Sequence, residues 1–418
     1  MGNKEKKQGS FVKNLKRALT LLLCVVLVIG CVNTLKTRKA EKAAAEAKEK
    51  AKHTVTEKTG KTSAQLLCAG DNLIHLAILE QAKQRSTNGR YDFSAPYQKI
   101  AETVRSADIA FLNQEVAIVP SQEPSSYPLF NSPPELLDEM IKLGFDVYNQ
   151  STNHIMDKFL SGALEDYDLF HSKKDIILTG LYKTWDEMFV PQVMERNDIK
   201  FSFCGFTQYL NGLIVPEDSD LGLVYLTDTR HSEEELYQTM EKMIKVNKAA
   251  SDICCVSMHW MNEDITTPDE SQRKIAQKLA DYGADIIIGT GPHVLQPIEY
   301  ITRADGNKTL VIWSLGNLIS TQANFENTLG GLAQVMVEKN YDTKSVSISS
   351  VEFIPTVTHY EYGKSNVRII PFSEYSQDLA AVHGSGNLSY DKIKAYYTNM
   401  FGDFLKLYDN KQEATSVQ

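Results

Sequence analysis

Short apolar runs alternate with helix-like segments along most of this chain, and this alternation constrains the fold more than any other feature. Eight runs rich in β-branched and aromatic residues have the length of strands. They lie at 65–70, 108–113, 145–149, 175–179, 200–206, 252–259, 285–289 and 309–314. Periodic segments at 134–143, 233–247 and 270–282 predict helices between several of them. This order predicts an α/β fold with a mostly parallel core.

Polar residues gather where these apolar runs stop. In α/β sheets the carboxyl ends of the strands line the ligand crevice, so these clusters are expected to converge although they are far apart in the chain. They supply six oxygen- or imidazole-bearing side chains, Asp71, Glu115, Asn153, His154, His259 and His293. Such a mixed set suits Mn, Fe or Zn. Taken singly, each residue also has a structural explanation, such as a helix cap or a turn.

Six short motifs make the pattern specific. They read AGDNLIH (69–75), NQEVAI (113–118), NHIMD (153–157), SMHW (257–260), GPHVLQPIE (291–299) and WSLGN (313–317). Over roughly residues 65–355 the chain resembles the capsule-synthesis (CapA) family of poly-γ-glutamate producers, which belongs to the calcineurin-like metallophosphatase superfamily. The resemblance implies a metallophosphatase-like layered αββα sandwich over residues 63–357.

The resemblance also implies a role for each polar residue, with one or two divalent ions (Mn, Fe or Zn) as cofactor. Five residues would bind metal: Asp71 and His293 one ion, Asn153 and His259 the other, with Glu115 bridging them. His154 would give a proton to the leaving oxygen, and Asp157, three positions on, would orient His154. Beside the site, Trp260 would form an apolar wall, and Asn317 would contact the substrate or the metal loop.

The sequence departs from the superfamily pattern at two places. Leu73 and Gly291 stand where histidine ligands are expected, which predicts weaker metal binding, with one tight site rather than two. Glu263, four residues after His259, could fill a vacancy or contact the substrate. His75 is the least secure candidate, because a position on the first turn of the following helix explains it better than a role in the site.

The N-terminal segment predicts attachment to a membrane. Basic residues precede an uncharged stretch at 18–32, as in a secretory signal. The stretch ends in a lipobox-like VIGC, which makes Cys31 a candidate for lipidation. An uncleaved signal-anchor helix within 1–35 is the alternative. Either reading places the body outside the cytoplasm at the cell membrane, with the Ala/Lys/Glu-rich stretch at 36–62 as a helical or disordered spacer.

Charge and the remaining segments limit the function. Residues 1–61 carry 15 Lys/Arg against 5 Asp/Glu, which leaves 29 against 48 in the body. So acidic a body disfavours nucleic acid as a partner. Residues 358–418 are expected to form an extension ending in an amphipathic helix at 390–408. Within the body, neighbouring Cys254 and Cys255 are expected to point to opposite faces of a strand, so no disulfide should join them.

Two functions remain open at this level. The first is a metal-dependent hydrolase that acts on a phosphoester or a cell-envelope polymer. The second is a non-catalytic component that binds nascent poly-γ-glutamate and supports its synthesis or export beside membrane partners of the capsule synthesis complex. The two missing imidazoles favour the second function, whereas the retained polar residues favour the first.

Overall fold

The computed structural model describes residues 58–405 except 88 and 387, together with Lys36, Lys39 and Lys42, which are helical. The expected anchor at 1–35, its Cys31 and most of the spacer at 36–62 lie outside the described residues. The chain divides into two units, and the second, Gly60–Gln418, holds every feature discussed below. Within the described ranges, no helix has the length and apolar character needed to cross a bilayer.

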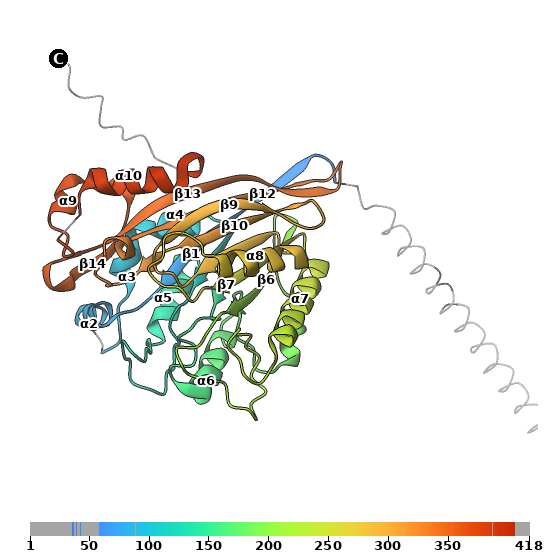
Figure 1. Ribbon diagram of the computed structural model, residues 1–418, viewed down its shortest axis with the longest axis horizontal. Coiled ribbons are helices and arrows are strands. Elements are labelled where there is room, and N and C mark those ends of the chain that lie inside the picture. The colour runs from blue at the N-terminus through green and yellow to red at the C-terminus, as the bar shows by residue number, and fades with distance from the viewer. Residues whose placement is uncertain are drawn as a thin grey trace, which may run out of the picture. The chain divides into compact units, whose positions relative to one another are not determined.

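The described part of the second unit contains two mixed β-sheets (Figure 1). The first has the order β14 (Ser365–Pro371), β13 (Ser345–Glu361), β12 (Leu329–Asn340), β1 (Lys61–Asn72), β2 (Ile109–Asn113), β3 (Val147–Asn149) and β4 (Ile177–Thr179), and β11 (Asn317–Ile319) also pairs with β1. The second has the order β5 (Gln192–Arg196), β6 (Ile199–Thr207), β7 (Ile253–His259), β8 (Ile286–Thr290), β10 (Lys308–Leu315) and β9 (Leu295–Thr302). Strands β1 to β4 pair parallel, as do β6, β7, β8 and β10.

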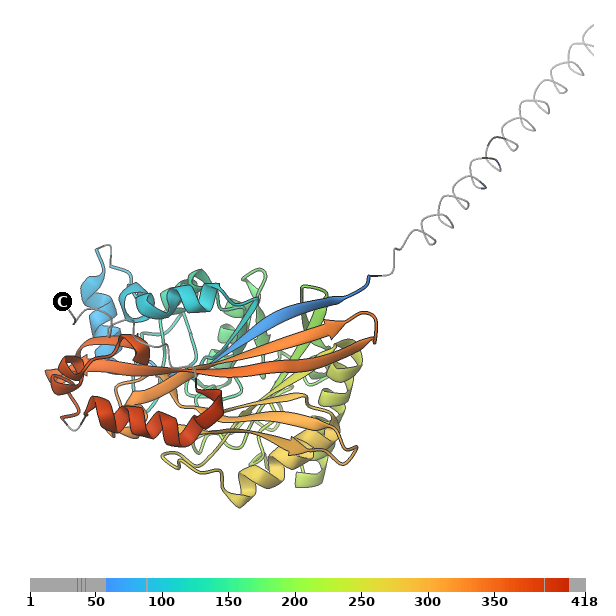
Figure 2. The same ribbon diagram turned by 90° about the horizontal axis from the view of Figure 1, so that it is seen from above.

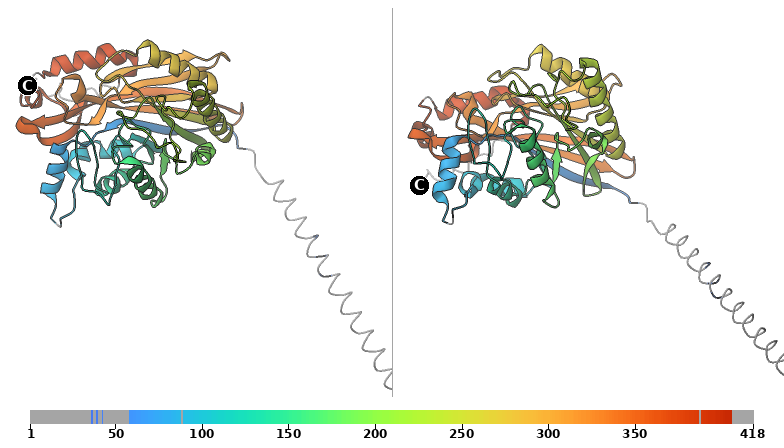
Figure 3. Two further views of the ribbon diagram at one scale, coloured as in Figure 1. Left: turned by 60° about the horizontal axis from the view of Figure 1, so that its bottom comes forward. Right: turned by 90° about the horizontal axis from the view of Figure 1, so that it is seen from below.

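Helices cover the outer face of each sheet. The first sheet packs against α2 (Leu76–Arg85), α3 (Ser94–Tyr97), α4 (Ala101–Arg105), α5 (Glu135–Leu143) and α6 (Phe159–His171). The second packs against α7 (Glu233–Ala250) and α8 (Glu270–Tyr282). In the left view of Figure 3, the blue-to-green helices lie on one side of the strands and the yellow helix α8 on the other.

Alternating side chains divide the apolar interior into three layers, as strand geometry requires. In β1, Leu67 packs toward the helices, whereas Leu66 packs between the sheets. In β7, Cys255 packs between the sheets, whereas Cys254 packs toward α7 and α8. The order is therefore helix, sheet, sheet, helix, as predicted, and the opposite orientation of the two cysteines is confirmed; both are free thiols.

Local sequence signals set the ends of the helices that follow the strands. Ser232 is the N-cap of α7 and Asp269 is the N-cap of α8, each in a capping box in which the side chain three positions on bonds back to the cap. Helix α8 ends at Gly283, whose φ of 117° is left-handed. These signals fix where the chain turns between one strand end and the next helix.

Every predicted strand run overlaps an observed strand, and the three predicted helices correspond to α5, α7 and α8. The predicted mostly parallel core is incomplete, because five further strands pair antiparallel: β5, β9, β12, β13 and β14. The long strands β12 and β13 extend the first sheet beyond its parallel half.

The C-terminal segment is part of the sandwich and not an extension from it. The expected boundary at 357/358 falls inside β13, and β14 then continues the same sheet. Helix α9 (Gln377–Ala381) and helix α10 (Tyr390–Phe401) follow, and α10 is shorter than the predicted helix at 390–408. Ile393, Tyr397 and Phe401 are buried in the core between the sheets, and Phe401 stacks on Phe353 of β13 at 3.6 Å. Helix α10 therefore docks along the long strands (Figure 2).

Candidate metal and catalytic site

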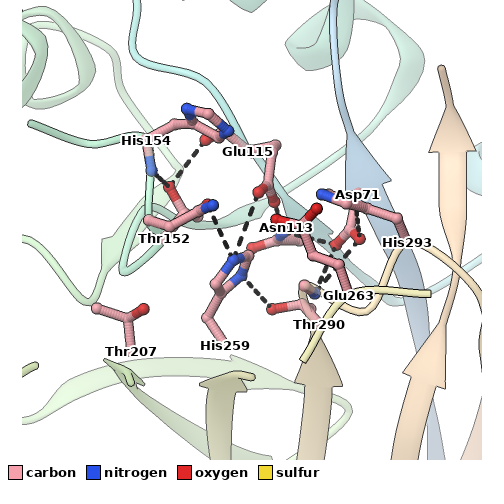
Figure 4. Close-up of polar contacts among 12 residues, drawn as sticks. Asp71, Asn113, Glu115, Thr152, His154, Thr207, His259, Glu263, Thr290 and His293 are labelled. Carbon is pink, nitrogen blue, oxygen red and sulfur yellow. Dashed lines mark hydrogen bonds and ion pairs between the residues drawn. The ribbon is translucent and has the colours of Figure 1, made fainter. Parts of the chain in front are cut away.

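The ends of parallel strands form two rows of polar residues. In the first sheet, β1 to β4 place Asp71, Asn113, Asn149 and Thr179 in register. In the second sheet, β6, β7 and β8 place Thr207, His259 and Thr290 in register. Hydrogen bonds and ion pairs join the groups around these ends (Figure 4). The predicted convergence of the strand ends is therefore confirmed.

A pair of carboxylates lies at the centre of this cluster, and both side chains are fully buried. The Asn113 amide donates to Asp71 Oδ1 at 2.8 Å and to Glu115 Oε2 at 2.6 Å. Asn149 Nδ2 donates to Asn113 Oδ1 at 2.8 Å, which directs the Asn113 NH₂ group toward the two acids. One amide thus holds two acidic groups side by side in a water-poor environment.

His293 balances the charge of Asp71. Its Nδ1 lies 2.9 Å from Asp71 Oδ2, and the Gly291 N–H lies 3.3 Å from each oxygen of that carboxylate. Burial alone would lower the pKa of His293, but the hydrogen bond and the charges of Asp71 and Glu115 raise it to about 9. Burial alone would raise the pKa of Asp71, yet His293 holds it below its usual value. The two residues therefore form an ion pair.

Glu115 has no such partner. Burial and the negative charge of Asp71 raise the pKa of Glu115 well above its usual value. Its Oε1 makes no hydrogen bond, although His259 Nε2 lies 3.4 Å away. A buried carboxylate in this state is stabilised as an anion when a cation is close.

His259 connects Glu115 to the second sheet. Its Nε2 lies 3.1 Å from Asn153 Oδ1, and its Nδ1 lies 3.0 Å from Thr290 Oγ1. Burial lowers the pKa of His259 to about 3, so the ring is neutral near pH 7. Asn153 Nδ2 donates to Tyr209 Oη and Asn211 Oδ1, each at 3.0 Å, which leaves Asn153 Oδ1 facing the histidine. A neutral imidazole is the form that binds metals.

This donor set fits one divalent ion. Glu115 Oε1 and Asn153 Oδ1 lie within 3.4 Å of His259 Nε2. Metal–ligand bonds of about 2.0–2.2 Å place neighbouring ligand atoms roughly 3 Å apart. Across residues 58–405, apart from 88 and 387, no group of three or more His, Cys, Asp or Glu side chains has a metal-binding arrangement. The candidate therefore depends on the Asn153 amide oxygen as a third ligand.

The two departures from the superfamily pattern have structural causes. Leu73 is 2% exposed and packs in the apolar core beneath α2. At Gly291, which has a φ of 96°, an added Cβ would lie 2.6 Å from Trp260 O and 2.9 Å from His259 Nε2. A histidine at position 291 would therefore displace His259.

His154 and Asp157 form the expected pair beside the cluster. His154 Nδ1 lies 2.8 Å from Asp157 Oδ2, which also accepts from Phe130 N at 2.7 Å. The Phe130 ring packs edge-on against His154, with their centroids 4.7 Å apart. The Asn211 amide nitrogen lies 3.2 Å from His154 Nδ1. The ring is thus restrained from three sides.

Glu263 and His75 lie at the edge of the cluster, and neither directly joins the donor set around His259. Glu263 is exposed and accepts a 3.1 Å hydrogen bond from Tyr209 Oη, so it reaches Asn153 only through that tyrosine. His75 is the N-cap residue of α2, and its Nδ1 accepts from Thr321 N at 3.4 Å. The explanation of His75 by the start of a helix therefore matches its position.

Trp260 has a structural contact where an apolar wall was expected, whereas Asn317 contacts the loop of His293, the second of its two expected roles. Trp260 is fully buried in the layer beneath α7 and α8, and its indole N–H donates to Trp313 O at 3.0 Å. Trp260 therefore lies behind the site and does not form its wall. Asn317 Nδ2 donates to His293 O at 3.1 Å and to Asn327 O at 3.0 Å, which ties together the loops that hold His293.

Several residues of this site were not predicted as site members. Asn113, Asn149 and Thr290 are the last residues of their strands, so the strand-end signal used for Asp71 could have found them. Tyr209 and Asn211 lie in the long connection between β6 and α7, where no periodicity or motif marks them. They reach the site only because the sheets pack together.

Fold and site together define a layered α/β protein with polar groups at the strand ends of two packed sheets. The family model of the bacterial capsule synthesis protein PGA_cap matches residues 65–322, and the chain belongs to this family. The predicted CapA-family resemblance is therefore confirmed.

Two curated relatives carry related names. The PGA biosynthesis protein CapA of Bacillus subtilis (strain 168) is 28% identical over 198 residues, which cover 47% of this chain and 48% of that protein. The capsule biosynthesis protein CapA of Bacillus anthracis is 25% identical over 207 residues, covering 49% and 47%. The chain thus matches about half the length of these relatives.

Solved structures of low sequence identity were also found. A phosphatase from Mycoplasma pneumoniae matches with a TM-score of 0.39 at 16% identity, over 71% of this chain and 94% of that one. The calcineurin-like phosphoesterase YfkN from Bacillus subtilis matches with a TM-score of 0.37 at 12% identity, over 71% and 90%.

Proposed function

We propose that this chain is a membrane-anchored, extracytoplasmic protein of poly-γ-glutamate capsule biosynthesis that hydrolyses a phosphoester or a cell-envelope polymer with a divalent metal. One observation carries the hydrolase part: Glu115 Oε1 and Asn153 Oδ1 both face the neutral His259, beside the restrained His154–Asp157 pair. The family and its two curated relatives support the capsule context.

In this proposal Glu115, Asn153 and His259 hold the ion. With Nε2 on the ion, His259 Nδ1 would donate to Thr290 Oγ1, 3.0 Å away, which fixes the plane of the ring. Tyr209 and Asn211 fix the Asn153 amide with its oxygen toward the histidine. A bound divalent ion would polarise the phosphoryl oxygen and lower the pKa of a coordinated water. The contacts of Thr290, Tyr209 and Asn211 would orient the metal ligands and tune their affinity for the ion.

His154 would supply the proton for the leaving oxygen. Asp157 accepts from Nδ1, which leaves Nε2 as the atom that faces a substrate. Phe130 and Asn211 restrict rotation of the ring. In the Asp71–His293 ion pair the imidazolium offsets the charge of one buried acid, so that less negative charge would oppose a phosphoryl anion.

A non-catalytic polymer-binding or export component is the second candidate. Leu73 and Gly291 favour it, because Leu73 is part of the apolar core and an added Cβ at Gly291 would crowd His259, so neither position supplies an imidazole for a second metal. The acidic body weighs against direct binding of a polyanion such as poly-γ-glutamate unless a cation mediates the contact.

Metal analysis and a phosphodiester assay separate the two candidates. Full-length protein purified with Mn²⁺ or Zn²⁺ should bind about one ion per chain, as the single donor set suggests. His259→Ala should lose the metal. His154→Ala should keep it and lose about 10²–10⁴-fold in turnover. His231→Ala, a histidine stacked on Trp185 away from the site, is the control and should change neither. Wild-type protein without metal would overturn the hydrolase proposal.

The membrane proposal has its own measurement. Mass spectrometry of the mature protein should show either a lipidated Cys31 as the first residue or an intact signal anchor. A mature N-terminus downstream of Cys31 would contradict both forms of anchoring.

A further inference from the structure

Exposed apolar side chains gather around the candidate site. Among the described residues, twelve large hydrophobic side chains are exposed, and seven of them lie in the segments that follow β1, β2, β3, β6 and β7. These seven are Leu76, Tyr127, Leu129, Phe159, Ile214, Met261 and Ile265. Scattered exposed hydrophobics need no explanation, but their concentration in the segments that follow the strand ends of a polar site indicates binding.

Four of the seven lie in segments that hydrogen bonds join, and they are here named the apolar rim: Leu76, Tyr127, Leu129 and Phe159. They are 55%, 77%, 39% and 62% exposed. Hydrogen bonds that involve serine and lysine side chains bring their segments together. Leu76 N donates to Ser126 Oγ at 2.9 Å, and Lys158 Nζ donates to Ser125 Oγ at 2.8 Å and to Leu129 O at 3.1 Å.

The apolar rim is connected to the catalytic candidate through Phe130. This buried ring contacts Tyr127 at 6.4 Å between centroids, His154 at 4.7 Å and His75 at 5.4 Å. The Phe130 ring therefore separates the rim from the residue proposed to protonate the leaving oxygen, and a group lying on the rim is one aromatic ring away from His154.

Phe159 adds a second observation. Its φ is +58°, a left-handed conformation that is unusual for a bulky residue. It directly follows Lys158 and opens α6, two positions after Asp157. Strain of this kind concentrates at functional sites, and here it presents an aromatic ring to solvent.

We propose that the apolar rim binds an aliphatic chain attached to the anionic group that enters the polar cluster, so that the substrate is an amphiphilic phosphoester. The inference rests on the proposed function and specifies its substrate class. Four side chains are far fewer than the 20–30 residues that each partner contributes to a protein interface. This difference favours one aliphatic chain, and not a protein partner, as the occupant. The four side chains carry no charge, so they cannot pair with the carboxylates of a polyanion.

Calorimetric titration with a series of n-alkyl phosphates, from ethyl to octyl, tests the inference. Full-length protein with Mn²⁺ should bind each longer homologue about twofold more tightly per added CH₂. Complete burial of a CH₂ group would raise the affinity roughly fourfold, and a twofold change corresponds to about half of that binding free energy. A combined Leu76→Ser and Phe159→Asn variant should bind ethyl phosphate like the wild type but lose the dependence on chain length. Asn tolerates a positive φ, so this variant should fold, as far-UV circular dichroism can verify.

Tyr300→Ala is the matched control, because Tyr300 is 42% exposed on β9 and outside the rim. It should keep the chain-length dependence. Equal affinity for all homologues, no binding of any homologue, or the same loss in the control would overturn the inference. A change in oligomeric mass of the rim variant would identify the rim as a contact between copies and would also overturn it. The proposed hydrolysis fails separately, when homologues bind with chain-length dependence but none is cleaved.

Discussion

Replacing Gly291 with alanine should damage both stability and metal binding. The glycine has a φ of 96°, and an added Cβ would lie 2.6 Å from Trp260 O and 2.9 Å from His259 Nε2. A left-handed alanine costs about 1–2 kcal/mol, and relief of the two close contacts adds about 1–3 kcal/mol. The total loss is therefore about 2–5 kcal/mol in the free energy of unfolding. Displacement of His259 should weaken Mn²⁺ binding by about 10–100-fold.

Gly306→Ala separates the two causes. Gly306 has a φ of 84°, but an added Cβ there would have no atom within 4 Å. This control should lose only the backbone contribution of about 1–2 kcal/mol and bind metal normally. Urea unfolding followed by far-UV circular dichroism gives the stability change, and calorimetric titration with Mn²⁺ gives the affinity. If Gly291→Ala matches Gly306→Ala in both measurements, the crowding at His259 has no consequence and the reasoning is refuted.

Three further predictions concern other parts of the molecule. Asp157→Asn should keep the bound metal but lower turnover about 10–100-fold, because His154 Nδ1 loses its charged partner; an unchanged turnover would remove Asp157 from the mechanism. Tyr397→Phe should destabilise the fold by about 1 kcal/mol, since the buried hydroxyl donates to Thr356 O at 2.6 Å; no change in urea midpoint would show that this contact of α10 does not contribute to stability. Burial, with a smaller effect of Arg368, lowers the pKa of His359 to about 4. The contribution of the neutral His359 to stability is therefore fully present above pH 6.5 and is lost as the pH falls toward 4. The free energy of unfolding of the wild type should decline more steeply over this window than that of His359→Gln. Equal slopes would contradict this prediction.

The sequence alone located much of the sheet architecture. Apolar runs such as 252–259 can be recognised because a strand buried on both faces must be apolar along its whole length. The strands β12 to β14 were not predicted. The first part of β13 lies outside the core between the sheets, and its residues alternate in polarity. The alternation of strands and helices on which the prediction rests also ends before β13 begins. Antiparallel pairing also needs no intervening helix.

The candidate site was predictable wherever a residue follows its strand directly. Asp71 and His259 terminate strands or lie one residue from the end, so pattern and motif place them at the crevice. Their chemistry was not predictable in this way. The pKa of about 9 at His293 results from a carboxylate 222 positions earlier in the chain.

Tertiary structure decided which residues can act and which only pack. Trp260 follows His259 directly, yet the strand alternation turns its side chain into the opposite layer. Tyr209 and Asn211 carry no sequence signal, yet they orient Asn153. The sequence by itself determined the parallel strands, three of the helices and the order of polar groups along them, because these depend on local periodicity. Distances between side chains from the two sheets depend on how the layers pack, and only the folded structure sets them.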